Sequence, residues 1–225
     1  MSFIKKVCIL ALLVLMTWAG LIFYSGWQMY EAALANCPLE EKVQEVTAQP
    51  HFTTLDQLPQ VYLDAVLAVE DRSFYHHHGF SFRATGRAVI RNFQEGELAE
   101  GGSTITQQLA KIWYFDLNKK FDRKVAELLM AFHIEKDYEK KEILEFYLNS
   151  IYFGSGYYNV YDASMGYFGK VPSEMNDYEA TMLAGIPNAP SVYSPDVNPD
   201  LAEQRRQQVI QCMEQYGYIE KGAIQ

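Results

Sequence analysis

The chain has 225 residues, of which 49% are hydrophobic and 21% charged, a balance typical of a globular protein and not of a disordered one. Its formal net charge of −9 argues against a general nucleic-acid-binding protein, because such proteins usually carry a basic face. This acidic total still allows a local basic site for an anionic substrate.

The first predicted element is a membrane anchor. Residues 7–27 carry no formal charge, and Lys5 and Lys6 precede them. At about 1.5 Å per residue, this run matches a hydrocarbon core of about 30 Å. The two lysines predict a cytoplasmic N-terminus, so the chain that follows should lie outside the membrane. We therefore predict a cytoplasmic tip and transmembrane anchor over 1–27.

The flanks of this run are consistent with an anchor but leave one alternative. Tyr24, Trp27 and Tyr30 fall where an outer interfacial belt of aromatic residues would lie. A cleaved signal peptide is the alternative, since residues 33–35 (Ala-Leu-Ala) offer a small-residue cleavage site. The apolar run is, however, longer than the usual signal core of about 7–15 residues.

The rest of the chain is predicted to be a linker followed by one domain. Residues 28–57 indicate a stalk, with a short helical continuation and then polar sequence that contains two prolines. Residues 58–225 contain helical patterns separated by Gly and Pro, and almost no strand-like alternation. One helix is expected to bury Val125, Leu128, Leu129 and Phe132. The fold class predicted for this domain is mainly α.

Glu70 is the first candidate catalytic residue. It follows Tyr62, Val66 and Val69 on one face of a helix that opens after Pro59. A carboxylate at the end of an apolar stripe is partly desolvated, which raises its pKa toward values useful for proton transfer. An arbitrary Glu-Asp pair is more often a solvated helix end, so the residue alone is weak evidence.

Two polar clusters follow. Thr104, Gln107 and Lys111 share spacings of three and four after a Gly-Gly pair, and such a stripe suits an oxygen-rich anion such as a diphosphate. A second cluster contains basic residues and, four positions after Arg123, Glu127. Its cations suit a leaving diphosphate, although a capped helix and a surface ion pair are the simpler explanations for each cluster alone.

Taken in order, these segments resemble the motifs of the family 51 peptidoglycan glycosyltransferases, which include monofunctional enzymes and the glycosyltransferase domains of bifunctional penicillin-binding proteins. The matches are Glu70-Asp71-x-x-Phe74-x-x-His77-x-Gly79, Gly101-Gly102-Ser103-Thr104-Ile105-Thr106-Gln107-Gln108-Leu109-x-Lys111, Arg123-Lys124-x-x-Glu127, Ile143-Leu144-Glu145-x-Tyr147-Leu148-Asn149 and Arg205-Arg206-x-x-Val209. The second motif is long and specific, whereas the fifth alone would be weak.

The resemblance implies a lysozyme-like domain that polymerises lipid II into β-1,4-linked glycan strands, with inversion and release of undecaprenyl diphosphate. Glu70 matches the general base, and Glu127 matches the second essential carboxylate. The matched substrate-binding positions are Asp71, Phe74, His77, Ser103, Thr104, Gln107, Lys111, Lys119, Arg123, Lys124 and Asn149. No cofactor is required in the family, but a divalent ion such as Mg²⁺ helps some members and would lie near Glu127.

The same resemblance implies a location and a set of partners. The protein would cross the bacterial cytoplasmic membrane once, with its catalytic domain on the outer face. Its partners would be lipid II, the growing lipid-linked glycan, the membrane and other wall-synthesis and division proteins, with no nucleic acid. Asn159 departs from the family pattern, where a glycine is usual, and we expect only a local adjustment there, because asparagine tolerates a left-handed backbone better than most residues.

Two other functions are compatible with the sequence. A lytic enzyme that cleaves glycan on a lysozyme-like fold would also use a catalytic glutamate. It would not need the cations Lys111, Lys119 and Arg123, because its substrate carries no diphosphate. An inactive membrane scaffold for wall synthesis is the other alternative, and the intact acids Glu70 and Glu127 argue against it.

Overall fold

The chain folds into a single long helix and a body of shorter helices. The computed structural model describes residues 3–83, 85–86, 102–115 and 121–224. Its elements are α1 (Phe3–Asn36), α2 (Leu39–Thr47), η1 (Leu55–Gln57), α3 (Gln60–Glu70), η2 (Phe74–His76), α5 (Ile105–Tyr114), α6 (Phe121–Asp137), α7 (Lys140–Leu148), α8 (Val160–Phe168), η3 (Pro172–Glu174), α9 (Asp177–Gly185), η4 (Ile186–Asn188), α10 (Pro190–Tyr193) and α11 (Pro199–Gln215). No strand occurs within the described ranges, which confirms the prediction of a mainly α fold.

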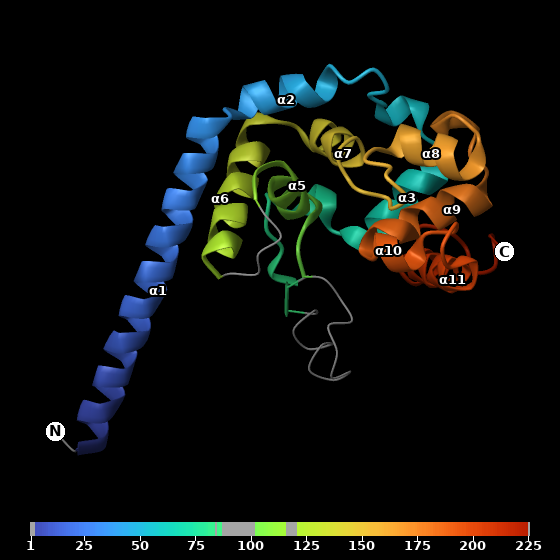
Figure 1. Ribbon diagram of the computed structural model, residues 1–225. Coiled ribbons are helices and arrows are strands. Elements are labelled where there is room, and N and C mark those ends of the chain that lie inside the picture. Colours follow the sequence, from blue (N-terminus) through green and yellow to red (C-terminus); the bar gives the residue numbers. More distant parts are fainter. Residues whose placement is uncertain (1–2, 84, 87–101, 116–120, 225) are drawn as a thin grey trace.

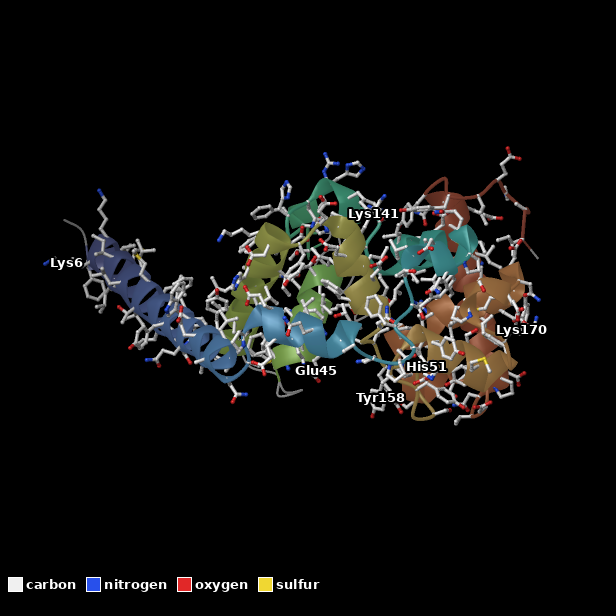
Figure 2. All side chains as sticks on the ribbon, turned by 90° about the horizontal axis from the view of Figure 1, so that it is seen from above. Lys6, Glu45, His51, Lys141, Tyr158 and Lys170 are labelled. Atoms are coloured by element: carbon white, nitrogen blue, oxygen red, sulfur yellow. The ribbon has the colours of Figure 1, made fainter. Side chains whose placement is uncertain are left out.

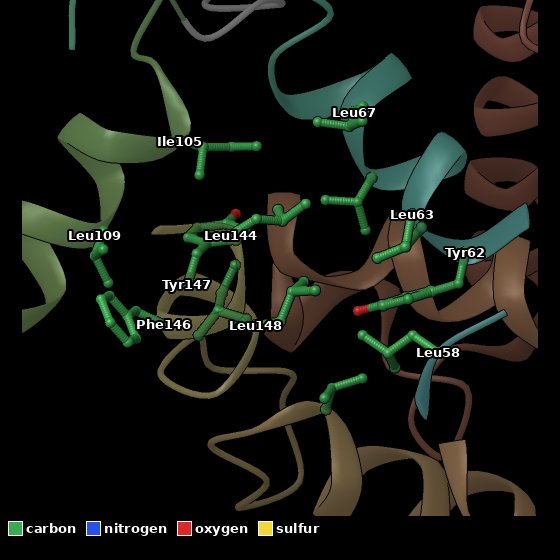
Figure 3. Close-up of a cluster of buried hydrophobic side chains, with 14 of the residues drawn as sticks. Leu58, Tyr62, Leu63, Leu67, Ile105, Leu109, Leu144, Phe146, Tyr147 and Leu148 are labelled. Atoms are coloured by element: carbon green, nitrogen blue, oxygen red, sulfur yellow. The ribbon is translucent and has the colours of Figure 1, made fainter. Parts of the chain in front are cut away.

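The centre of the body is a hydrophobic core shared by α3, α5 and α7. Figure 3 shows side chains from these three helices converging on one cluster. Tyr62 of α3, Ile105 and Leu109 of α5, and Leu144 of α7 are all completely buried. As the sequence predicts, α3 begins directly after Pro59 and ends at Glu70. The core therefore fixes three helices relative to one another. These are α3, which ends at Glu70, α5, which carries the predicted polar residues, and α7, which is followed by Asn149.

The long helix α1 extends away from the body, and the part from Trp18 onward contacts α6, where the Trp18 and Phe121 rings lie 6.2 Å apart. At about 1.5 Å per residue, its 34 residues span about 51 Å. Its most apolar window has a mean hydropathy of 2.4 and is fully exposed, so α1 is long and apolar enough to cross a membrane. Figure 1 shows the upper part of α1 beside α6, and Figure 2 shows Lys6 at the free end, far from Lys170 on the body.

Three polar or close contacts join α1 to α6. Ser25 Oγ donates a hydrogen bond of 3.1 Å to Asp122 Oδ2. Five residues further along α1, Tyr30 Oη lies 3.0 Å from His133 Nδ1. Between them, Gly26 is the one buried residue of α1, because the backbone of α6 approaches it closely. The anchor helix is therefore a packed neighbour of α6 over this stretch.

We expect Gly26→Ala to weaken this docking. A methyl group at position 26 would lie 2.6 Å from both Asp122 O and Val125 Cβ, so one helix must move. Overpacking of this kind costs about 1–3 kcal/mol. The measurement is the distance between spin labels on α1 and α6, together with the thermal unfolding midpoint. Gly20→Ala is the matched control, because nothing lies within 4 Å of that site, and an equal effect of both changes would contradict the docking.

Part of the predicted stalk is packed on the body. Leu39 and Val46 of α2 are 2% and 3% exposed and belong to the hydrophobic core. Asn149 at the end of α7 exchanges two hydrogen bonds of 2.8 Å with the backbone of Thr53. Figure 1 shows α2 crossing the top of α6 and α7. Residues 39–57 thus cover one end of the domain.

The predicted apolar stripe of α6 is wrong. Phe132 is 46% exposed, and the buried positions are Ala126, Glu127, Met130, Ala131 and Ile134. The physical reason is that α6 lies between α1 and α5, so small residues as well as large ones are needed for close packing on two sides. At Asn159 the backbone lies outside the left-handed region, with a φ of −151°, and the side chain caps α8 by accepting a hydrogen bond from Asp162 N.

Candidate active site

Glu70 is the last residue of α3 and is half-buried against α5. Gln108 Nε2 donates a hydrogen bond of 2.8 Å to Glu70 Oε2. The hydroxyl of Tyr147, from α7, donates in turn to Gln108 Oε1 at 3.2 Å. Each of the three core helices thus contributes one residue to a hydrogen-bonded chain that ends at the carboxylate.

The electrostatic surroundings of Glu70 suit a group that exchanges a proton. Burial is the main cause that raises the pKa of Glu70, and the nearby Asp71 carboxylate raises it further. The Gln108 hydrogen bond, the Arg205 guanidinium and the Lys111 ammonium act in the opposite direction and favour the carboxylate. Glu70 therefore lies close to two cations and retains a pKa above the usual range for glutamate.

Asp71 and His77 tie the segment after α3 to the start of α5. Asp71 Oδ2 accepts a hydrogen bond of 3.1 Å from Ile105 N and lies 2.7 Å from His77 Nε2. Thr104 Oγ1 donates to Gly79 O at 2.8 Å. Gly79 has a φ of +83°, a backbone that other residues rarely adopt. Asp71, His77 and Thr104 are all buried, so these predicted binding residues are bonded within the fold.

The start of α5 explains why Gln108, and not Gln107, reaches Glu70. Thr104 and Gln107 form a reciprocal cap, in which Gln107 N donates to Thr104 Oγ1 at 3.1 Å and Thr104 N donates to Gln107 Oε1 at 3.0 Å. This cap turns Gln107 inward, where it is 4% exposed. Gln108 and Lys111, three positions apart, then share the face toward Glu70, and a spacing of four from Thr104 could have identified Gln108 in the sequence.

A second charged cluster lies on α6. Glu127 is completely buried, with its Oε2 at 2.6 Å from Lys124 Nζ and its Oε1 at 2.8 Å from Arg123 Nε. The second contact is an ion pair by distance, although the N–H does not point at the oxygen. Lys124 Nζ also donates to Ser103 Oγ at 3.0 Å. This cluster brings together all three predicted residues of the third motif.

The contact between Lys124 and Ser103 connects the two clusters. Ser103 precedes α5 by two residues, and Gln108 is the fourth residue of that helix. Helix α5 therefore has the Glu127 cluster at its start and Glu70 beside its middle. Predicted residue Lys119 and motif residue Gly101 lie outside the described residues.

Two predicted site residues are structural parts of the body. Phe74 is 1% exposed in the core, with Lys140 Nζ 4.4 Å from the centre of its ring. Asn149 is also 1% exposed, and its amide bonds hold the segment at Thr53 against α7. Arg205, known from the sequence only as part of the weak fifth motif, instead acts electrostatically on Glu70.

The residues near Glu127 do not fit a divalent ion. Both of its carboxylate oxygens already face cations, which would repel a second positive charge. In the described part of the chain, no group of three or more His, Cys, Asp or Glu side chains is arranged to hold a metal. Of the three consecutive histidines, His77 bonds Asp71, whereas His76 and His78 are exposed.

Comparison with known protein families gives one match. Residues 39–214 match the family model described as "Transglycosylase". This range begins at the first residue of α2 and ends in α11, so it includes Glu70, Glu127 and every helix of the body between them.

Several proteins are similar over the same part of the chain. Penicillin-binding protein 1F of Bacillus subtilis is 44% identical over 166 residues, and penicillin-binding protein 1A of Aquifex aeolicus is 44% identical over 168 residues. These matches cover 74% and 75% of this chain, but the chain spans only 23% of either relative. A Cupriavidus necator protein named as a transglycosylase is 40% identical over 191 residues, which cover 85% of this chain and 82% of that protein.

Proposed function

Because this chain belongs to the transglycosylase family, and is therefore a glycosyltransferase, we propose that it polymerises lipid II into β-1,4-linked glycan strands. The observation that carries this proposal is the position of Glu70. Its partly desolvated carboxylate is held by Gln108 and lies near the cations Lys111 and Arg205. A base and a set of cations at one place suit a reaction in which a hydroxyl attacks and a diphosphate leaves.

In the proposed reaction, Glu70 takes the proton from the 4-hydroxyl of the acceptor sugar. The acceptor oxygen forms a bond to C1 of the donor sugar as the C1–oxygen bond to the diphosphate breaks, and the configuration at C1 is inverted. The donor here is the lipid-linked glycan, and undecaprenyl diphosphate leaves with the bonding electrons. A general base of this kind contributes about 10²- to 10⁴-fold to a rate.

The cations are proposed to stabilise the departing diphosphate. Lys111 acts electrostatically on Glu70. Lys124 bonds Ser103 just before the start of α5, and Arg123 pairs with the same Glu127 as Lys124. Glu127 would hold Arg123 and Lys124 in place, because both cations are within 2.8 Å of its oxygens. Cations that are already in position where negative charge develops lower the activation barrier, because no protein groups need to reorganise during the reaction.

The anchor contact is consistent with a substrate that stays in the membrane. Ser25, which bonds Asp122, lies between Tyr24 and Trp27, the residues expected at the outer membrane interface. Asp122 immediately precedes Arg123 and Lys124 on α6. With the N-terminus inside, docking of α1 would therefore hold these cations near the depth of lipid headgroups, on the outer face of the cytoplasmic membrane.

Several predicted binding residues would act as supports for the site. Asp71, His77 and Thr104 are proposed to fix the end of α3 against the start of α5 through their internal hydrogen bonds. Phe74 and Asn149 would do the same through packing and backbone bonds. A substrate would then contact the more accessible residues Ser103, Lys111, Arg123 and Lys124.

The experiment that tests this function supplies the full-length protein with lipid II that carries a label in its sugars. Electrophoresis should separate a series of glycan polymers, and the yield of polymer should match the release of undecaprenyl diphosphate. Finished cell wall is incubated in parallel. Digestion of the wall without formation of polymer would favour the lytic function, and no reaction with either substrate would favour the scaffold.

Lys111→Ala should impair use of the donor more than use of the acceptor. Loss of one cation beside a diphosphate should lower kcat/KM for the donor about tenfold to a hundredfold, because a hydrogen bond to a charged group is worth about 1.5–3 kcal/mol. Steady-state kinetics with donor and acceptor varied separately measure this difference. Lys136→Ala is the matched control, since that lysine is 81% exposed on α6. Equal losses for donor and acceptor would contradict the diphosphate role of Lys111.

A further inference from the structure

We propose that Gln108 and Tyr147 act as a relay that orients Glu70 and favours its ionised form. Both are positioning residues, and neither is among the residues that the motifs predict to be catalytic or substrate-binding. Their role rests on the proposed function, in which Glu70 must begin the reaction as a carboxylate.

The amide of Gln108 can lie in either of two directions between Glu70 and Tyr147. With Nε2 toward Glu70, the amide donates to the carboxylate and its Oε1 accepts from Tyr147, at 2.8 and 3.2 Å. With the amide reversed, Oε1 would require a protonated Glu70 as donor, and Nε2 would donate to the phenol oxygen. The direction of this amide is thus coupled to the ionisation of Glu70.

Tyr147 favours the first direction because of its hydroxyl hydrogen. This side chain is 1% exposed, and burial raises the pKa of Tyr147 well above its ordinary value, so the phenol keeps its proton. Within the described ranges, Gln108 Oε1 is the one acceptor bonded to this hydroxyl. Reversal of the amide would leave a buried O–H without an acceptor, and such groups are costly. The hydroxyl therefore stabilises the arrangement in which Glu70 is ionised.

The other groups around Glu70 do not replace this relay. Arg205 and Lys111 favour the carboxylate, but they act electrostatically and do not fix the direction of either carboxylate oxygen. Burial and the Asp71 carboxylate both disfavour the ionised form of Glu70, and burial has the largest effect of all these groups on its pKa. In the described structure, Gln108 is the one side chain that donates a hydrogen bond to Glu70, and it does so at Oε2. Oε1 is then left for the hydroxyl of the acceptor sugar.

The test is the pH dependence of kcat/KM for the full-length protein acting on lipid II. In Tyr147→Phe, the acidic limb of the profile should move upward by about one pH unit. Activity well below the limb should then fall about tenfold, while activity above it should stay within about twofold of wild type. A loss that is equal at all pH values, together with an unchanged titration of Glu70 itself, would show a merely structural role and overturn the proposal.

Two further variants make the test specific. Tyr62→Phe is the matched control, because Tyr62 is also a completely buried tyrosine of the core, but its hydroxyl has no hydrogen-bond partner in the described structure. Its acidic limb should not move. Gln108→Leu should raise the limb at least as far as Tyr147→Phe, and adding Tyr147→Phe to it should cause no further shift, since Tyr147 acts through Gln108. Additive shifts would contradict the relay.

A direct measurement separates this proposal from the function on which it rests. Carbon-13 NMR of labelled glutamate carboxyl groups, with Glu70→Gln to assign the signal, reports the protonation of Glu70 without any turnover. If Tyr147→Phe leaves the Glu70 titration unchanged, the relay is refuted, whichever reaction the protein catalyses. If the titration moves upward but the pH–rate profile does not, the relay stands and Glu70 is not the base.

Discussion

Replacement of Glu70 by glutamine is expected to lower the rate of glycan polymerisation about a thousandfold, while the lipid substrate still binds. Glutamine fills the same volume and can still accept a hydrogen bond from Gln108 Nε2, but it cannot take a proton from the acceptor hydroxyl. The measurement combines the single-turnover rate with the affinity for lipid II. A variant that polymerises at near the wild-type rate would show that Glu70 is not the base.

The same variant has an expected effect on stability. Because burial raises the pKa of Glu70 in the folded chain, its carboxyl group contributes stability below its unfolded pKa and loses that contribution as pH rises through the folded pKa. Glutamine cannot ionise, so Glu70→Gln should be at least as stable as wild type at pH 7, and the difference should disappear in acid. Glu174→Gln, at an exposed site on η3, controls for the loss of one negative charge and should change neither quantity.

Replacement of Glu127 by glutamine is expected to reduce both stability and polymerisation. The change leaves Arg123 and Lys124 without the carboxylate that holds them. Breaking a fully buried pair costs about 3–5 kcal/mol, and the half-exposed Lys124 reduces that figure here to about 2 kcal/mol. We expect turnover of the folded fraction to fall about a hundredfold, because the cations lose their positions. Chemical unfolding and kinetics at saturating lipid II measure the two effects.

Glu135→Gln is the matched control for Glu127→Gln. Glu135 lies on the same helix, and its side chain is 4% exposed. Its Oε1 pairs with Lys140 Nζ at 2.6 Å and accepts a hydrogen bond from the buried Thr106, but within the described ranges it contacts neither Ser103 nor the cations of the Glu127 cluster. It should lose a similar amount of stability but retain the turnover of its folded fraction. If both variants lost turnover to the same extent, the effect at Glu127 would be structural and its proposed role in holding the cations would be wrong.

Local sequence patterns predicted the parts of the fold in which near neighbours along the chain determine the structure. Pro59 marked the start of α3, and the apolar spacing that ends at Glu70 identified a helix end with a partly desolvated carboxylate. The spacing of Arg123 and Glu127 predicted an ion pair that forms across one turn of α6. In each case the relevant contacts lie within four residues or follow from one helix face.

Local sequence patterns could not predict the contacts between segments that are distant along the chain. The buried face of α6 could not be identified because α1, about a hundred residues earlier, covers one side of it through Ser25, Gly26 and Tyr30. Gln108 was not selected, although the spacing of Thr104 and Gln107 fits a capping box that turns Gln107 inward and leaves Gln108 to face Glu70. In the sequence, Tyr147 cannot be distinguished from an ordinary core residue of α7. Only the structure shows that its hydroxyl donates a hydrogen bond to Gln108.

The most direct test of the account is a structure of the full-length protein bound to two lipid-linked molecules, in which the donor carries a phosphonate that cannot leave. We predict the donor diphosphate within ion-pair distance of Lys111 and of Arg123 or Lys124. The acceptor 4-hydroxyl should lie within hydrogen-bond reach of Glu70 Oε1. A donor whose diphosphate binds on another face of the molecule, away from α5 and α6, would contradict the central claim that one base and these cations act on the same reacting centre.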